Sequence, residues 1–270
     1  MSNPPLPPEL LDSVVDFLHD SHRSLRVCSL VSKSWIPRAR KHLFANVEFT
    51  YQRTLRSWKA TFPDPAASPA HYTKTLRIRY PHCVALADAK EGCTCLISTF
   101  SRVVDFAIEI STGYSRVPET SLVPFYAFSL VLKSLDACLP HIPHSRVFIF
   151  ILSFPLLEDL SLNLSISPTD DLDWQPATIQ SSTSPPFTGS FNLILPGGMN
   201  PFVHHLLSLP GGLHFRKLHL RWWHGEDPSS TAALVQMCSP TLESLHIDCG
   251  PGGTSSLAYN LASHSAHLCL

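Results

Sequence analysis

The chain has 270 residues and a nearly balanced charge, with 20 lysines and arginines against 21 acidic residues and a formal net charge of −1. This length allows one large domain or two, with enough apolar side chains for a stable core. The balance provides neither a basic field for nucleic acid nor an acidic tail for a cationic partner, so we expect neither kind of binding.

Membrane insertion and secretion are also disfavoured. The N-terminal residues lack the basic and then apolar pattern of a secretion signal, and the most apolar window, residues 147–164, contains Pro155, Glu158 and Asp159. The 8 cysteines are irregularly spaced, which is typical of reduced thiols. We therefore expect a protein of the cytoplasm, the nucleus or both.

The first apolar run, LPPELLDSVVDFLHD at residues 6–20, predicts a short amphipathic helix. Pro7 and Pro8 fit its first turn, where the amide groups have no partner within the helix. Glu9 favours the same end through the helix dipole. The apolar residues that recur at helical spacing are Leu10, Leu11, Val14, Val15 and Leu18.

A second apolar stripe follows in SLRVCSLVSKSW, residues 24–35. It places Leu25, Cys28, Val31 and Trp35 at steps of three and four. One interpretation is the core of an ordinary helical bundle. However, a unit of only about 40 residues cannot easily bury so many large apolar side chains by itself. The surplus favours docking onto another surface.

These motifs of residues 5–45 resemble an F-box, closest to those of mushroom-type (basidiomycete) fungal proteins. The resemblance implies three short helices that bind the Skp adaptor of a cullin-RING (SCF-type) ubiquitin ligase. Ser32 departs from the family, which usually has the nearly isosteric cysteine there. By position, the residues implied to face the adaptor or brace the helix that does are Leu6, Pro7, Leu10, Leu11, Val14 and Leu18. Those implied to complete the surface are Leu25, Cys28, Val31 and Trp35.

From residue 46 onward, a strand-like pattern, apolar-x-x-Leu-x-apolar, recurs roughly every 25 to 31 residues, close to the period of leucine-rich repeats. Apolar stretches with proline or glycine breaks separate the copies. Residues 46–270 therefore predict an α/β solenoid with a curved parallel sheet. The predicted strand centres are Leu76, Phe106, Leu135, Leu160, Phe191, Leu218 and Leu245.

A non-repeating α/β domain is the alternative, because most copies lack the asparagine or cysteine that usually follows the strand. The arrangement nevertheless also resembles fungal F-box proteins with degenerate leucine-rich repeats. The predicted fold class is thus α/β, with an N-terminal three-helix F-box followed by a leucine-rich-repeat-like solenoid.

Two stretches interrupt the repeats and contain candidate target-binding tryptophans. Residues 165–190 are rich in Ser, Thr and Pro and predict an extended loop. There Trp174, beside three aspartates, is either a contact point or the anchor of a spacer. In RWWHGEDP, residues 221–228, strand alternation makes one of Trp222 and Trp223 point away from the core. That side chain is either a binding anchor or covered by the adjoining loop.

Catalytic and metal-binding motifs are weak. The sequence lacks a G-x-S-x-G elbow, a glycine-rich phosphate loop and H-E-x-x-H. The best metal candidates are His82, Cys83, Cys93 and Cys95. The C-T-C spacing differs from the C-x-x-C of a zinc knuckle, so we expect buried thiols there. We therefore expect neither an enzyme nor a metal or other cofactor.

The predicted function is a non-catalytic substrate receptor. The F-box would bind the Skp adaptor and the solenoid would hold an unknown protein target, raising the local concentration of target lysines near the conjugating enzyme. One alternative is an adaptor-bound scaffold without ubiquitination. A remote alternative is a hydrolase with an unrecognised triad.

The C-terminus predicts a poorly capped sheet. After the strand near Leu245, the chain offers glycines and then enough apolar residues for one short helix. We expect an edge strand at about 243–248 with unpaired outer backbone groups and a weakly packed helix beyond residue 254. These features are expected of a shortened version of a longer receptor.

Overall fold

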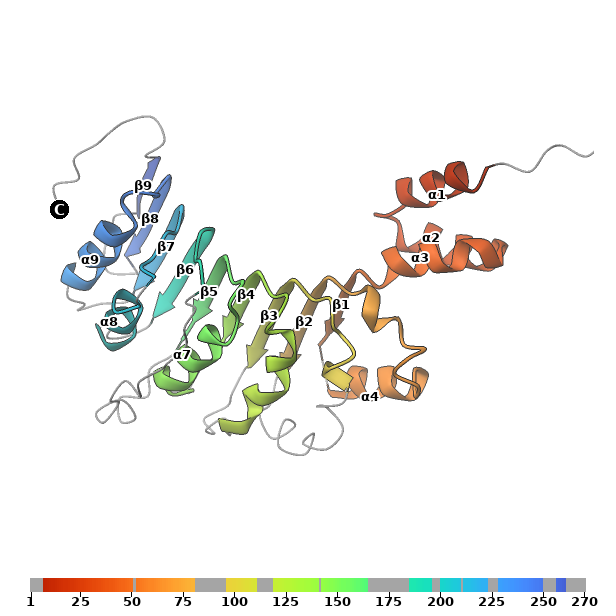
Figure 1. The fold of residues 1–270 in the computed structure, drawn as a ribbon, viewed down its shortest axis with the longest axis horizontal. Coiled ribbons are helices and arrows are strands. Elements are labelled where there is room, and N and C mark those ends of the chain that lie inside the picture. Colours follow the sequence, from red (N-terminus) through yellow and green to blue (C-terminus); the bar gives the residue numbers. More distant parts are fainter. Residues whose placement is uncertain are drawn as a thin grey trace, which may run out of the picture.

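The computed structural model describes residues 7–50, 52–80, 96–110, 119–140, 142–164, 185–195, 200–209, 211–222, 228–249 and 256–260. In these residues the architecture is α/β, with seven α-helices and one open sheet of nine strands (Figure 1). None of the described helices is long and apolar enough to cross a lipid bilayer.

The strands follow one another across the sheet in chain order, from β1 at one edge to β9 at the other. β1 to β8 are parallel, and β9 runs antiparallel to β8. The strands are β1 (Asn46–Phe49), β2 (Thr75–Tyr80), β3 (Asp105–Ile110), β4 (Ser134–Cys138), β5 (Asp159–Asn163), β6 (Ser190–Leu195), β7 (Lys217–Trp222), β8 (Ser244–Cys249) and β9 (Ser256–Asn260).

Three helices precede the sheet and the others lie between its strands. The α-helices are α1 (Pro8–Phe17), α2 (His22–Val31), α3 (Ile36–Leu43), α4 (Gln52–Thr61), α7 (His144–Leu152), α8 (Asn200–Leu207) and α9 (Pro228–Cys238). Short 3-10 helices are η1 (Lys33–Trp35), η2 (Pro69–Tyr72) and η3 (Glu119–Phe128).

The predicted strand centres lie side by side in register, so the prediction of one parallel sheet is confirmed. The ladder begins one strand earlier than predicted, at Val47. It continues through Leu76, Phe106, Leu135, Leu160, Phe191, Leu218 and Leu245. Each of these side chains is at most 8% exposed. Because side chains alternate along a strand, residues two positions further form a second buried ladder, from Phe49 on β1 to Ile247 on β8.

The main core lies between these ladders and the helices, which Figure 1 shows along one side of the sheet. Phenylalanines fill much of this layer. Phe191 on β6 stacks on Phe215, with ring centroids 4.9 Å apart, and Phe106 on β3 lies 5.0 Å from Phe125 of η3. The layer is therefore a continuous core that runs the length of the sheet.

α1, α2 and α3 have a small core of their own, beyond β1 in Figure 1. Its fully buried members are Val15, Leu25 and Ala39. α3 continues almost directly into β1, and the joint is fixed by the Ala45 carbonyl, which accepts hydrogen bonds from the amides of Lys74 and Thr75. The three helices are thus attached to one edge of the sheet.

The strand predicted at about 243–248 is present as β8, but the prediction that it forms an unpaired edge is wrong. β9 covers the edge of β8, with Leu257 opposite Ile247 and Tyr259 opposite Leu245. Residues 256–260 are therefore a strand where a helix was expected. The last parallel strand exposes a row of amide and carbonyl groups, and a strand that returns antiparallel pairs them, which a helix cannot do.

Candidate functional site

The clearest candidate site is an excess of exposed apolar side chains on α1 and α2. Among the described residues, ten large apolar side chains are exposed, and six of them lie on these two helices. Large apolar side chains that gather exposed on neighbouring elements can mark an interaction site. The six residues are Leu10, Val14 and Phe17 on α1, and Val27, Leu30 and Val31 on α2. We call them the apolar stripes.

α1 begins as its sequence predicts and divides its apolar residues between two sides. Pro7 is its N-cap residue and Pro8 lies in its first turn. Val15 is fully buried against the other helices, whereas Phe17 is 85% exposed. The stripe of α1 follows the steps i, i+4, i+7 and therefore forms one line along the helix.

α2 carries apolar residues on two sides, and the described structure buries only one of them. Its N-cap is Ser21, whose hydroxyl accepts a hydrogen bond from the Ser24 amide at 3.3 Å. Leu25 and Cys28 are buried, whereas Leu30 is 86% exposed. A core as small as that of these three helices has no room for the second set.

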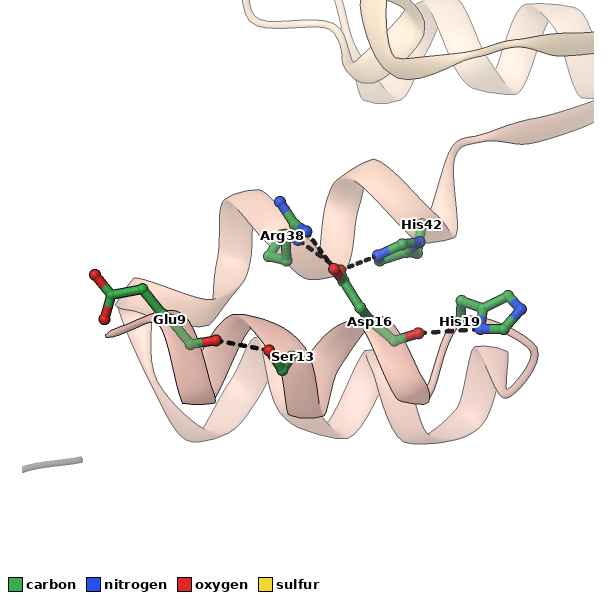
Figure 2. Close-up of polar contacts among 6 residues, drawn as sticks. All are labelled: Glu9, Ser13, Asp16, His19, Arg38 and His42. Carbon is green, nitrogen blue, oxygen red and sulfur yellow. Dashed lines mark hydrogen bonds and ion pairs between the residues drawn. The ribbon is translucent and has the colours of Figure 1, made fainter. Parts of the chain in front are cut away.

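A charged contact holds α1 against α3. Figure 2 shows Arg38 and His42 of α3 directed at the carboxylate of Asp16 on α1. Arg38 donates two hydrogen bonds to it, from Nε at 2.5 Å and from Nη2, and His42 Nε2 lies 2.7 Å from Oδ1. These hydrogen bonds, that from Arg38 above all, hold the pKa of Asp16 well below its ordinary value. Asp16 is therefore ionised at neutral pH and positions the helix that bears the first stripe.

The residues that the F-box resemblance singled out fall into three groups. Exposed are Pro7, Leu10, Val14 and Val31; partly buried are Leu11, Leu18 and Trp35. Leu25 and Cys28 are buried inside the helical unit, so in the free chain they brace the surface and do not belong to it. Leu6 lies outside the described residues.

Three exposed residues of the apolar stripes were not predicted from the sequence: Phe17, Val27 and Leu30. A signal was present in the spacing. Phe17 stands seven residues after Leu10, and Val27 stands four residues before Val31, both of which were predicted. Leu30 stands three residues after Val27. Asp16 was not among the predicted site residues either. The i, i+4 pair of bases at 38 and 42 was the signal that could have identified its partners.

The candidate target-binding tryptophans cannot be compared with the structure in the same way. Trp174, Trp223 and most of the loop at 165–190 lie outside the described residues, and Trp222 is the last residue of β7. The candidate metal cluster, His82, Cys83, Cys93 and Cys95, also lies outside them.

A second candidate surface is the face of the sheet opposite the core, where polar side chains alternate with the buried ladders. A hollow over β2 to β5 is lined by Arg77, Arg79, Glu109 and Asp136, among others. Arg79 bridges Glu48 and Glu109, with nitrogen–oxygen distances of 3.4 Å to each. Opposite charges on neighbouring strands thus neutralise one another along this part of the face.

The same face carries a polar group at its other end, on β7 and β8. A hydrogen bond from Arg221 is the main cause of the lowered pKa of Asp248. The pKa of His219 is lowered first by burial and then by the nearby charge of His246.

No model of a known protein family matches the chain, and no curated protein is similar to it in sequence.

Proposed function

We propose that this chain is the substrate-receptor subunit of an SCF-type ubiquitin ligase. Residues 5–45 would act as an F-box that binds a Skp-type adaptor, and residues 46–270 as a degenerate leucine-rich-repeat solenoid that recruits a protein target. The single observation that carries the proposal is the pair of apolar stripes on α1 and α2. They add a candidate docking surface to the residues whose motifs resemble an F-box.

Two features of the helical unit support adaptor binding. The unit has its own core and an Asp16–Arg38 contact, so the stripes are presented on helices that are already formed. Pre-formed elements lose less conformational entropy on association than segments that must fold first. An apolar helical face that docks into a groove on a partner is also a recurring mode of recognition.

The solenoid proposal rests on the regularity of the sheet. Consecutive members of the buried ladder are separated by about 25 to 31 residues, close to the period of leucine-rich repeats. Helical segments between consecutive strands lie on one side, and each strand pairs only with its neighbours in sequence. Among the described residues, the helices leave the polar face of the sheet available to a target (Figure 1). Recruitment alone would account for the proposed role in ubiquitination, because proximity raises the effective concentration of target lysines.

Adaptor capture tests the first half of the proposal. Replacing both Leu10 and Val14 by Asp should reduce binding of a purified Skp-type adaptor by about 100-fold or more, because two unpaired carboxylates would be buried at an apolar interface. Both side chains are half-exposed in the free chain, so folding should change little. The matched control is Leu130→Asp, at an exposed leucine near the sheet.

The F-box assignment fails if the double variant is folded, as judged by circular dichroism and thermal unfolding, and still binds the adaptor. It also fails if the control loses binding equally. Mass spectrometry of proteins that co-purify with the chain after proteasome inhibition tests the second half. A bound partner whose abundance does not respond to inhibition favours the scaffold without ubiquitination.

A further inference from the structure

The polar face of the sheet brings together two histidines and an aspartate that are distant in sequence. Parallel pairing of β7 and β8 places His219 directly opposite His246, and Asp248 follows two residues later on the same face. The intervening residue, Ile247, is buried in the core on the other face. The two imidazole rings meet edge to face, with centroids 4.5 Å apart.

The three side chains converge on one point. His219 Nε2 lies 3.9 Å from Asp248 Oδ2, and His246 Nε2 lies 3.7 Å from Asp248 Oδ1. One ligand atom of each residue lies within 4.8 Å of both others. Zinc–nitrogen and zinc–oxygen bonds of 2.0 to 2.2 Å place tetrahedral ligands about 3.4 Å apart. Small side-chain rotations would therefore bring all three atoms to bonding distance of one ion.

One ring nitrogen of this group lacks a hydrogen bond within the described structure. His219 Nε2 is buried and has no hydrogen-bond partner among the residues that the structure describes. Buried polar atoms are nearly always paired, and a nitrogen whose nearest carboxylate oxygen is 3.9 Å away has room for an atom between them. A cation bound by both groups would satisfy the nitrogen.

Arg221 fixes the carboxylate and restricts the kind of ion. Its Nε and Nη2 donate hydrogen bonds of 3.0 and 2.7 Å, both to Asp248 Oδ2, and Oδ1 is the oxygen nearer His246. Such contacts orient metal-binding carboxylates. The guanidinium charge also opposes a cation, so hard ions that depend on carboxylate charge, such as Mg²⁺, are disfavoured. Imidazole ligands suit zinc.

We propose that His219, His246 and Asp248 bind one zinc ion on the polar face of the sheet. Three protein ligands leave a fourth position for water or for a donor atom of a bound molecule. The proposal is independent of adaptor binding, because these residues and the apolar stripes lie at opposite ends of the described chain.

Metal binding to the full chain, stripped with a chelator, tests the proposal. Equilibrium dialysis against Zn²⁺ should give one more bound ion per chain for the unaltered protein than for the double variant His219→Asn/His246→Asn. Asp248→Asn should weaken binding at least tenfold. The matched control is His204→Asn, at an exposed histidine of α8, which should change nothing. Mg²⁺ at the same concentration should not compete.

Cobalt separates this site from cysteine sites elsewhere in the chain. Co²⁺ bound at this site should give visible d–d absorption without the near-ultraviolet charge-transfer band of a thiolate ligand. This measurement uses the unaltered chain, so it does not depend on whether a variant folds. Equal zinc stoichiometry in the double variant and the unaltered protein would overturn the proposal. So would a cobalt spectrum with thiolate character alone, or no saturable binding.

Discussion

The division between buried and exposed leucines on α2 can be tested with one chemical change at two positions. Leu25 is fully buried against Val15 and Ala39, whereas Leu30, five residues later on the same helix, is 86% exposed. Truncation to alanine removes the same atoms at both sites and preserves helix propensity. The two variants should therefore differ only through tertiary packing.

The structure sets the size of each effect. Truncation of a buried leucine costs 2 to 5 kcal/mol, and the cost rises with the volume of the cavity that remains. The helical unit is small and half-open and can partly collapse, so Leu25→Ala should cost roughly 2–3 kcal/mol of its stability. That corresponds to an increase of roughly 30- to 150-fold in the population of the opened unit. Leu30→Ala should change folding by less than about 0.5 kcal/mol.

Amide hydrogen exchange, measured by mass spectrometry, reports the stability of the helical unit separately from that of the sheet. Peptides from α1, α2 and α3 should exchange faster in Leu25→Ala by about the same factor, and peptides from β5 and α7 provide the internal reference. Leu30→Ala should leave exchange unchanged but weaken adaptor capture. A threefold or smaller change in Leu25→Ala, or equal acceleration in both variants, would refute the division.

Two further predictions follow from shifted pKa values. Asp16→Asn should accelerate exchange in α1 at neutral pH. Because the folded-state pKa of Asp16 is depressed, its contribution is present above the unfolded-state pKa of about 3.9 and is lost as pH falls below it. The difference between variant and unaltered chain should thus persist from pH 7 to about pH 5 and shrink below about pH 4; a constant difference down to pH 2 would contradict it. Burial raises the pKa of Cys238 to about 11, so the native chain should resist iodoacetamide at this thiol at pH 8 and react once denatured, whereas prompt native labelling would contradict the assigned burial.

The sequence by itself determined the repeating part of the fold. A buried apolar residue at every second position marks a strand, and a regular interval between strands leaves room for one crossover helix each. Those local patterns predict that the strands from Leu76 to Leu245 lie side by side, as they do in the sheet. The first strand, centred on Val47, is only four residues long and gives too short a pattern to recognise.

Tertiary structure alone decided which side of a helix is buried, which residues distant in sequence meet, and how the sheet ends. On α2 two apolar stripes have the same helical spacing, and only packing against α3 selects Leu25 for the core and leaves Leu30 exposed. Asp16 and Arg38 are 22 residues apart, and His219 and His246 are 27 apart, so helix packing and strand register bring each pair together. At the C-terminus, residues 256–260 form a strand because they pair with backbone groups of β8 that a helix would leave unpaired.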